Sequence, residues 1–217
     1  MKKKVKKSFC VAVGMLIVFV LWTVAVKFVD VRAIGPNSTE VGFATINKYI
    51  HNLTGVNMTL YTITDWLGLV PFAFVIGFGL SGLRQWIARK NILKVDYSIF
   101  VLGGFYIVVM AAYIFFEMFV INYRPILINN CLEASYPSST TMLVLCVMPT
   151  ALMELKSRIK NTVLRRCVTI AIFGFTAFMV IGRLLSGVHW ITDIIGGAML
   201  STGLVMLYYS VSNIKPQ

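Results

Sequence analysis

Gly182-Arg-Leu-Leu-Ser-Gly-Val-His-Trp-Ile-Thr-Asp193 is the stretch on which the predicted fold depends, because it places Arg183, His189 and Asp193 in a mostly apolar chain. On a helix, His189 and Asp193 share a face at their spacing of four residues. The carboxylate can then hold one imidazole nitrogen and leave the other free as a nucleophile. Arg183 has glycines nearby, and a turn would bring its planar cation to the same imidazole, as in a phosphate site. A loop arginine beside a packed histidine is the alternative.

The composition predicts an integral membrane protein. The chain has 217 residues, of which 58% are hydrophobic and 13% are charged, and its mean hydropathy is +0.82. Soluble domains contain about 25% charged residues, so the long apolar runs are interpreted as membrane spans. The four cysteines lie singly, without a CxxC pair. They indicate neither a metal site nor a particular disulfide.

The apolar segments predict an all-α integral membrane protein, with six transmembrane helices in one bundle and a single membrane-embedded domain over residues 1–217. Each span covers a bilayer core of ~30 Å. The first span follows five lysines but has no clear cleavage site, so we interpret it as an uncleaved span rather than a signal peptide. Residues 41–53 are predicted to form a helix on the membrane surface. The spans are expected at about 8–26, 66–83, 97–121, 138–153, 167–184 and 189–209.

The distribution of Lys and Arg predicts the orientation of the bundle. Fifteen of the 20 basic residues lie in the N-terminal segment, in the loops 84–94 and 156–166, and at the C-terminus. The positive-inside rule then makes both termini cytoplasmic. We expect the protein in the plasma membrane with its site facing outside. The net charge of +12 is interpreted as a topology signal, and no nucleic-acid partner is expected.

Polar residues at the outer ends of the last four spans form the candidate site. Pro125 is expected to end the third span directly after Arg124 and so to fix the direction of its guanidinium. Pro137 and Ser138 open the fourth span, where a helix N-terminus offers free N–H groups to an anion. Taken singly, these features suit a snorkelling arginine and an ordinary helix start. Together with the stretch 182–193, they describe a phosphate cradle with a nucleophile.

The same residues resemble three motifs of the type 2 phosphatidic acid phosphatase superfamily of membrane phosphatases, K-x6-R-P, P-S-G-H and S-R-x5-H-x3-D. The six-span layout is similar as well, so the resemblance covers most of the chain. In this sequence the motifs read Glu117-x6-Arg124-Pro125, Pro137-Ser138-Ser139-Thr140 and Gly182-Arg183-x5-His189-x3-Asp193.

The resemblance implies a hydrolase that removes a phosphate or diphosphate from a membrane lipid, such as phosphatidic acid or a polyprenyl diphosphate, on the extracytoplasmic side. His189 would be the nucleophile that forms a phosphohistidine, and Asp193 would orient it. The partners would be the lipid phosphate and the bilayer, and neither a metal nor another cofactor is implied. The phosphoryl oxygens would be held by Arg124, Ser138, Ser139 and Arg183.

Two motif positions are altered. Glu117 stands where the first motif has lysine, and Thr140 stands where the second motif has the histidine that protonates the leaving group in the family. Threonine cannot supply that proton near neutral pH. A diphosphate lipid would need the acid less, because it expels a phosphate rather than an alkoxide. Glu117 could replace the acid if it were buried and protonated, but we expect it to pair with Arg124 or Arg183.

Some alternatives stay open. His51 could replace the missing acid only if the first outer segment folds back over the site, and a surface position is favoured for it and for Glu133. A phosphotransferase of the same fold, or a catalytically impaired protein that binds lipid phosphates, competes with the hydrolase. A transporter is disfavoured, because the spans lack charged or broken centres in matching halves.

Overall fold

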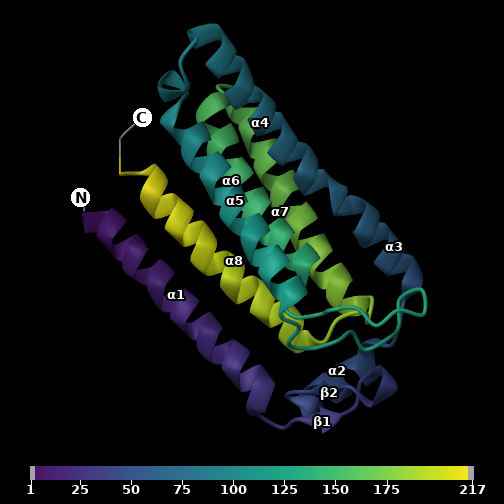
Figure 1. Ribbon diagram of the computed structural model, residues 1–217. Coiled ribbons are helices and arrows are strands. Elements are labelled where there is room, and N and C mark those ends of the chain that lie inside the picture. The colour runs from purple at the N-terminus through teal and green to yellow at the C-terminus, as the bar shows by residue number, and fades with distance from the viewer. Residues whose placement is uncertain (1–2, 215–217) are drawn as a thin grey trace.

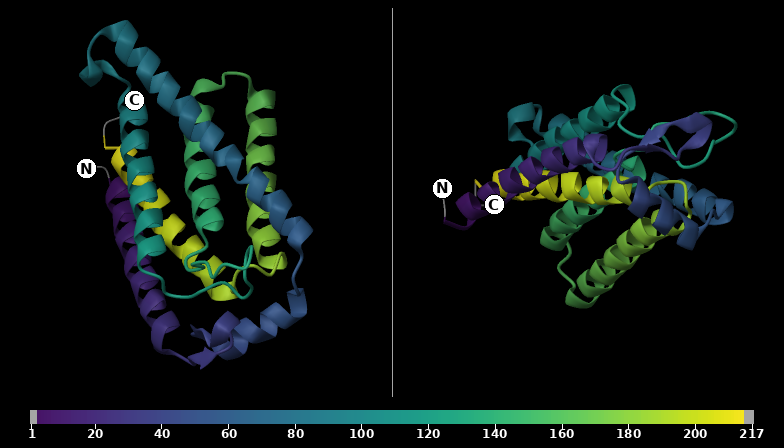
Figure 2. Two further views of the ribbon diagram at one scale, coloured as in Figure 1. Left: turned by 45° about the vertical axis from the view of Figure 1, so that its right-hand side comes forward. Right: turned by 90° about the horizontal axis from the view of Figure 1, so that it is seen from below.

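The computed structural model describes residues 3–214, which form a bundle of long helices (Figures 1 and 2). Six helical segments in this range are long and apolar enough to cross a membrane. This confirms the prediction of a mostly helical chain with six spans. The segments are α1 (Lys3–Phe28), α3 (Met58–Leu67) continued by α4 (Leu69–Arg89), α5 (Tyr97–Met118), α6 (Ser139–Arg158), α7 (Thr162–Leu185) and α8 (Ile191–Ser212).

Helix α8 contacts most of the other long helices. It packs against α1, α5 and α6, while α7 packs against α6 and α3 packs against α7. The beginning of α1 and the end of α8 lie at one end of the bundle, and the small elements α2, β1 and β2 lie at the other (Figure 1). We call the end opposite the termini the site end.

Small residues let α8 approach its neighbours closely. A Cβ atom on Gly196 would lie 2.5 Å from Cε2 of Tyr136, and one on Gly203 would lie 2.9 Å from Cγ of Leu16. Neither position accepts a larger side chain without movement of the neighbour. Close contact through small residues is a general way to pack helices in a membrane, where water does not drive their association.

The outward-facing side chains are apolar, as a bilayer requires. Ile76 on α4, Ile107 on α5 and Phe173 on α7 are 61%, 72% and 64% exposed. Large exposed apolar surfaces are rare on soluble monomers. On long helices of this composition they are the surfaces that contact lipid tails.

Two differences from the predicted span boundaries affect the site. The second span begins at Met58 rather than near residue 66, because α3 leads through Gly68 into α4. The third helix ends at Met118, before the loop that carries Arg124. Pro125 therefore does not end that helix, and Glu117 and Arg124 do not share a helical face. The loop has a fold of its own, in which the Arg124 amide donates to the Glu133 carbonyl.

Residues 29–57, which we call the outer segment, cover the site end. Strands β1 (Arg32–Ala33) and β2 (Glu40–Val41) pair antiparallel around the short helix η1 (Pro36–Ser38). Helix α2 (Ala44–Thr54) follows and confirms the helix predicted for this segment. A further short helix, η2 (Ile92–Lys94), lies in the loop between α4 and α5.

Asn47 of α2 attaches the outer segment to the beginning of α8. Its fully buried side chain donates to Thr192 Oγ1 at 3.0 Å and accepts from the Thr192 amide at 3.3 Å. The indole of Trp22 on α1 donates to the Thr192 carbonyl at 3.3 Å. Helices α1 and α2 thus both contact Thr192, the residue before Asp193. These contacts hold the start of α8 in place.

Replacement of Asn47 by alanine is expected to destabilise the protein. It leaves the Thr192 donors unpaired in a buried place, which costs about 1–3 kcal/mol and lowers the melting temperature in detergent by roughly 2–12 °C. The exposed Asn52 on the same helix is the matched control, and Asn52→Ala should melt like the wild type. Equal melting temperatures for all three proteins would contradict this role of Asn47.

Candidate active site

Ionisable residues from three parts of the chain are buried together at the site end. Arg124 lies in the loop after α5, Arg183 in the last turn of α7, and His189 and Asp193 around the start of α8. Their exposed fractions are 8%, 1%, 3% and 0%. Ser138, at the start of α6, joins the group because its amide donates to the Asp193 carbonyl at 3.0 Å.

A serine separates the predicted histidine–aspartate pair. Ser135 Oγ lies 2.9 Å from His189 Nδ1 and donates to Asp193 Oδ2 at 2.5 Å. The direct distance from His189 Nδ1 to Asp193 Oδ2 is 3.9 Å, too long for a hydrogen bond. The expectation that Asp193 holds the imidazole directly is therefore corrected, because the loop before α6 inserts a hydroxyl group between them.

The Asp193 carboxylate is surrounded by donors. Its Oδ2 also accepts from the Trp190 amide at 2.9 Å, which caps the N-terminus of α8, and its Oδ1 accepts from Asn122 Nδ2 at 3.4 Å. A buried carboxylate is tolerated only when such donors replace water. These contacts lock the positions of the loop and the helix start relative to each other.

The second nitrogen of His189 is free. Within residues 3–214, Nε2 is buried and has no hydrogen-bond partner. Burial lowers the pKa of His189 well below its usual value, and the nearby charges of Arg124 and Arg183 lower it further. The imidazole is therefore neutral at neutral pH and keeps a lone pair for nucleophilic attack.

Each arginine has an acidic neighbour and an aromatic one. Arg124 Nε lies 3.1 Å from Glu133 Oε2, and Arg183 Nη2 lies 3.4 Å from Asp65 Oδ1. The Cζ atoms of Arg124 and Arg183 lie 5.9 Å and 5.0 Å from the centre of the Tyr61 ring, within cation–π range. Tyr61 therefore stabilises two like charges that would otherwise repel each other.

Unpaired buried polar atoms concentrate in this site. In the described part of the chain, eight buried side-chain nitrogen or oxygen atoms have no hydrogen-bond partner. Six of the eight belong to five residues of the site. Native proteins leave few buried polar atoms unpaired, and each needs an explanation. A tetrahedral anion with several oxygens would satisfy the donors of this group. The six atoms, which lack a hydrogen bond although Arg124 Nε keeps its ion-pair contact with Glu133, are Arg124 Nε and Nη1, Arg183 Nε, His189 Nε2, Ser138 Oγ and Thr141 Oγ1.

Similarity to known proteins agrees with this geometry. The PAP2 superfamily profile matches residues 101–216, which is more than half of the chain. The chain belongs to the PAP2 superfamily. A similar solved structure is the crystal structure of a transmembrane PAP2-type phosphatidylglycerolphosphate phosphatase from Bacillus subtilis, with a TM-score of 0.59 and 18% sequence identity over 91% of this chain and 94% of that chain. This similarity supports the fold of a membrane lipid phosphatase. No curated protein matches the sequence.

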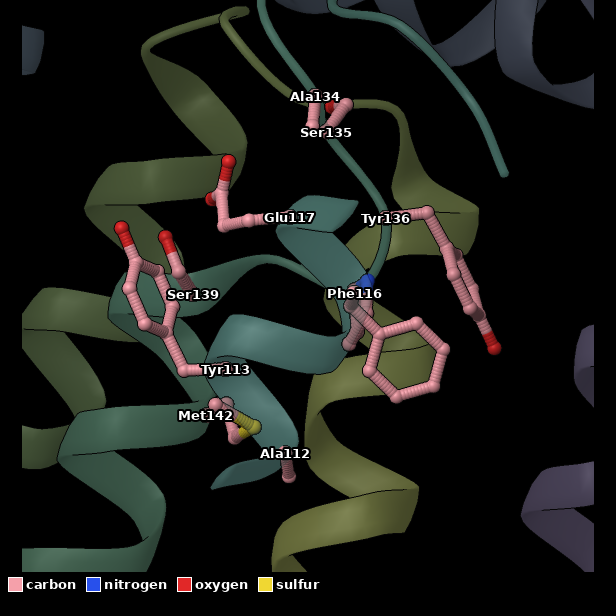
Figure 3. Close-up of a pocket in the computed structure, with 10 residues that line it drawn as sticks. Ala112, Tyr113, Phe116, Glu117, Ala134, Ser135, Tyr136, Ser139 and Met142 are labelled. Atoms are coloured by element: carbon pink, nitrogen blue, oxygen red, sulfur yellow. The ribbon is translucent and has the colours of Figure 1, made fainter. Parts of the chain in front are cut away.

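The first PAP2 motif is altered at Glu117, and its predicted ion pair is wrong. Among the described residues, Glu117 pairs with neither arginine, because Glu133 and Asp65 occupy them. Its side chain instead lines a small cavity, of about 10 Å³, between the end of α5 and the start of α6, together with Tyr113, Ser135 and Ser139. Figure 3 shows the side chains of Tyr113, Glu117 and Ser139 on the same side of this cavity.

The outer segment does fold back toward the site. The His51 ring lies 5.4 Å from the Trp190 ring, measured between centroids, and Trp190 is the residue after His189. The surface position favoured for His51 is thus corrected to a half-buried one. Burial lowers the pKa of His51. Glu133, also expected at the surface, faces Arg124 instead, although 40% of its side chain is exposed.

Several site residues escaped the sequence analysis. Tyr61, Thr64 and Asp65 form one face of α3 and contact Arg183, but only tertiary packing selects that face and the PAP2 match does not include it. The sequence did carry a local signal for the hairpin turn that precedes Ser135. Asn129 and Asn130, with φ of 50° and 60°, form the turn between the bridged residues 128 and 131. Asparagine tolerates the positive φ that a two-residue hairpin turn requires.

Removal of the Glu117 charge is expected to strengthen phosphate binding. Glu117 interacts electrostatically with Arg124. A carboxylate at this position repels an anion that binds to Arg124. One unit of charge changes binding by ~1 kcal/mol, or roughly fivefold. Glu117→Gln should lower the dissociation constant of inorganic phosphate by about that factor, measured by calorimetry in detergent, and Glu117→Lys should lower it further.

The control for this measurement is Glu40→Gln, which removes an exposed carboxylate on β2. It should leave phosphate binding unchanged. Weaker phosphate binding in Glu117→Gln would mean that this carboxylate supports the anion site rather than opposing it.

Proposed function

We propose that this chain is an integral membrane lipid phosphatase, which hydrolyses a terminal phosphate or a diphosphate group from a lipid through a phosphohistidine on His189. The observation that carries the proposal is the concentration of unpaired buried polar atoms on Arg124, Ser138, Thr141, Arg183 and His189. Planar guanidinium donors, hydroxyl groups and a helix N-terminus are together the groups that bind phosphoryl oxygens.

The reaction has two displacements. The lone pair of His189 Nε2 attacks the phosphorus atom in line, the bond from phosphorus to the lipid oxygen breaks, and that oxygen leaves with the bonding electrons. Water then attacks the phosphorus atom of the phosphohistidine, the phosphorus–nitrogen bond returns its electrons to the imidazole, and the proton that the water loses passes to the departing phosphate or to solvent. The charges of Arg124 and Arg183 stabilise the transferring group in both steps.

The leaving group decides which substrate suits a site without the second-motif histidine. An alkoxide has a conjugate acid with a pKa roughly like that of water, ~16, whereas a phosphate leaving group has a relevant pKa of about 6. Thr140 on α6 supplies no proton at neutral pH. We therefore propose a diphosphate lipid of the polyprenyl type as the preferred substrate, with phosphatidic acid as the poorer one.

The membrane setting supports a lipid substrate. The site lies at one end of a bundle whose other faces carry apolar side chains, so a lipid can enter sideways from the bilayer. The basic residues lie mostly at the end that holds the termini. This supports an extracytoplasmic site in the plasma membrane. The Bacillus subtilis protein of similar fold is a phosphatidylglycerolphosphate phosphatase, which supports a lipid phosphate as the substrate class.

Phosphate release by the purified protein in detergent tests this proposal. We expect release from a polyprenyl diphosphate and little from phosphatidic acid, with both lost in His189→Ala. Thr140→His should raise the rate on phosphatidic acid at least tenfold, because a positioned acid contributes roughly 10²–10⁴-fold to such a step. The same variant should change the diphosphate rate much less.

The other outcomes identify the alternatives. Equal release from both lipids by the wild type would overturn the diphosphate preference. Transfer of the phosphoryl group to another lipid instead of water would identify a phosphotransferase. No turnover of either lipid, with lipid phosphate still bound, would replace the hydrolase with a binding protein that has lost catalysis.

A further inference from the structure

We propose that Ser135 is a positioning residue that links His189 to Asp193 and fixes which imidazole nitrogen is free to react. The proposal rests on the function proposed above for His189. Ser135 Oγ lies 2.9 Å from His189 Nδ1 and 2.5 Å from Asp193 Oδ2, while these two atoms lie 3.9 Å apart. The hydroxyl group is therefore the only connection between imidazole and carboxylate among the contacts of the described residues.

The direction of the two hydrogen bonds follows from counting protons. A serine hydroxyl has one proton to donate, and here it goes to Asp193 Oδ2. The other partners of the Asp193 carboxylate are N–H groups, from Trp190 and Asn122, so the carboxylate acts only as an acceptor. Ser135 Oγ must then accept from His189, which places a proton on Nδ1. The neutral ring is left with its lone pair on Nε2.

The position of Ser135 is built into the loop. Its amide donates to the Asn122 carbonyl at 2.9 Å, and the side chain of Asn122 donates to Asp193 Oδ1. Both strands of the loop thus contact the same carboxylate. The residue is 3% exposed, so little bulk solvent reaches its hydroxyl group. Such a chain of buried hydrogen bonds holds an imidazole in one orientation and one tautomer.

We call the hydrogen-bond chain from His189 through Ser135 to Asp193 the relay. It also stabilises the covalent intermediate. When Nε2 bonds to phosphorus, the ring becomes a cation with its proton on Nδ1. The hydroxyl group of Ser135 then lies between that cation and the Asp193 carboxylate. A hydrogen-bond chain that ends in a buried negative charge stabilises the positive ring. The proton need not leave Nδ1 in either displacement.

The first test compares the turnover of Ser135 variants on a polyprenyl diphosphate. Ser135→Ala should lower kcat by roughly 10²-fold or more, because a histidine in the wrong tautomer is a poor nucleophile. KM should change by less than about threefold. Ser135→Thr keeps the hydroxyl group and should recover most of the rate. The control is Ser210→Ala, a buried serine on α8 that bonds only within its own helix.

The second test asks whether Ser135 and Asp193 act as one unit. If they do, the double variant Ser135→Ala/Asp193→Asn should be hardly slower than the slower of the two single variants. Multiplied losses in the double variant would mean that the two residues act separately, and this outcome would overturn the relay.

The third test reads the tautomer directly and needs no turnover. The chain has only two histidines, His51 and His189, so a protein labelled with nitrogen-15 in histidine gives two sets of ring signals. His51→Asn assigns them. We expect the Nδ1–H tautomer for His189 in the wild type and in Ser135→Thr, and its partial or complete loss in Ser135→Ala.

These tests separate failure of the relay from failure of the proposed function. A His189→Ala variant that still releases phosphate would overturn the nucleophile and leave the tautomer result unaffected. An inactive His189→Ala protein together with a fully active Ser135→Ala protein of unchanged tautomer would overturn the relay alone. Unchanged binding of inorganic phosphate by Ser135→Ala shows that the variant is folded, and a loss of both binding and thermal stability would assign Ser135 a structural role instead.

Discussion

The burial of the Asp193 carboxylate is the constraint on which the site depends. A charged group at 0% exposure is stable only if donors replace the water it loses. Those donors come from the loop after α5, as Ser135 and Asn122, and from the start of α8, as the Trp190 amide. Satisfying one carboxylate therefore fixes two chain segments that carry Arg124 and His189.

The same constraint positions the other residues of the proposed phosphate site. The Ser138 amide bonds to the Asp193 carbonyl, which places the N-terminus of α6 beside His189. Trp190 donates from its indole to the Tyr123 carbonyl at 2.9 Å, which holds the residue before Arg124. The atoms proposed for catalysis are thus positioned by backbone groups and short side chains, which lose little conformational freedom when they are ordered.

The second electrostatic constraint on the site is the repulsion between the neighbouring guanidinium groups of Arg124 and Arg183. Tyr61, Asp65 and Glu133 surround them, so their charges are partly balanced before a substrate binds. A phosphate group brings more negative charge and better geometry than either carboxylate. Because Asp65 and Glu133 are 57% and 40% exposed, they are free to turn to solvent on the proposed binding of a phosphoryl group.

Much of this architecture could be predicted from the sequence. Apolar segments of sufficient length gave the six spans, and the spacing of Arg183, His189 and Asp193 placed them in one site. What the sequence did not show depends on long-range packing. Nothing in the sequence of α3 marks Tyr61 as an arginine partner. Arg124 pairs with Glu133 rather than Glu117 because the loop after α5 folds back on itself, with a β-bridge between residues 123 and 134.

The proposed mechanism transfers the phosphoryl group first to His189 and then to water. The stereochemical course at phosphorus tests this most directly, using a polyprenyl diphosphate whose terminal phosphorus is made chiral with sulfur and heavy-oxygen isotopes. Two in-line displacements, with His189 as the first nucleophile, predict net retention of configuration in the released thiophosphate. Net inversion would mean that water attacks the lipid directly, and it would contradict the phosphohistidine mechanism.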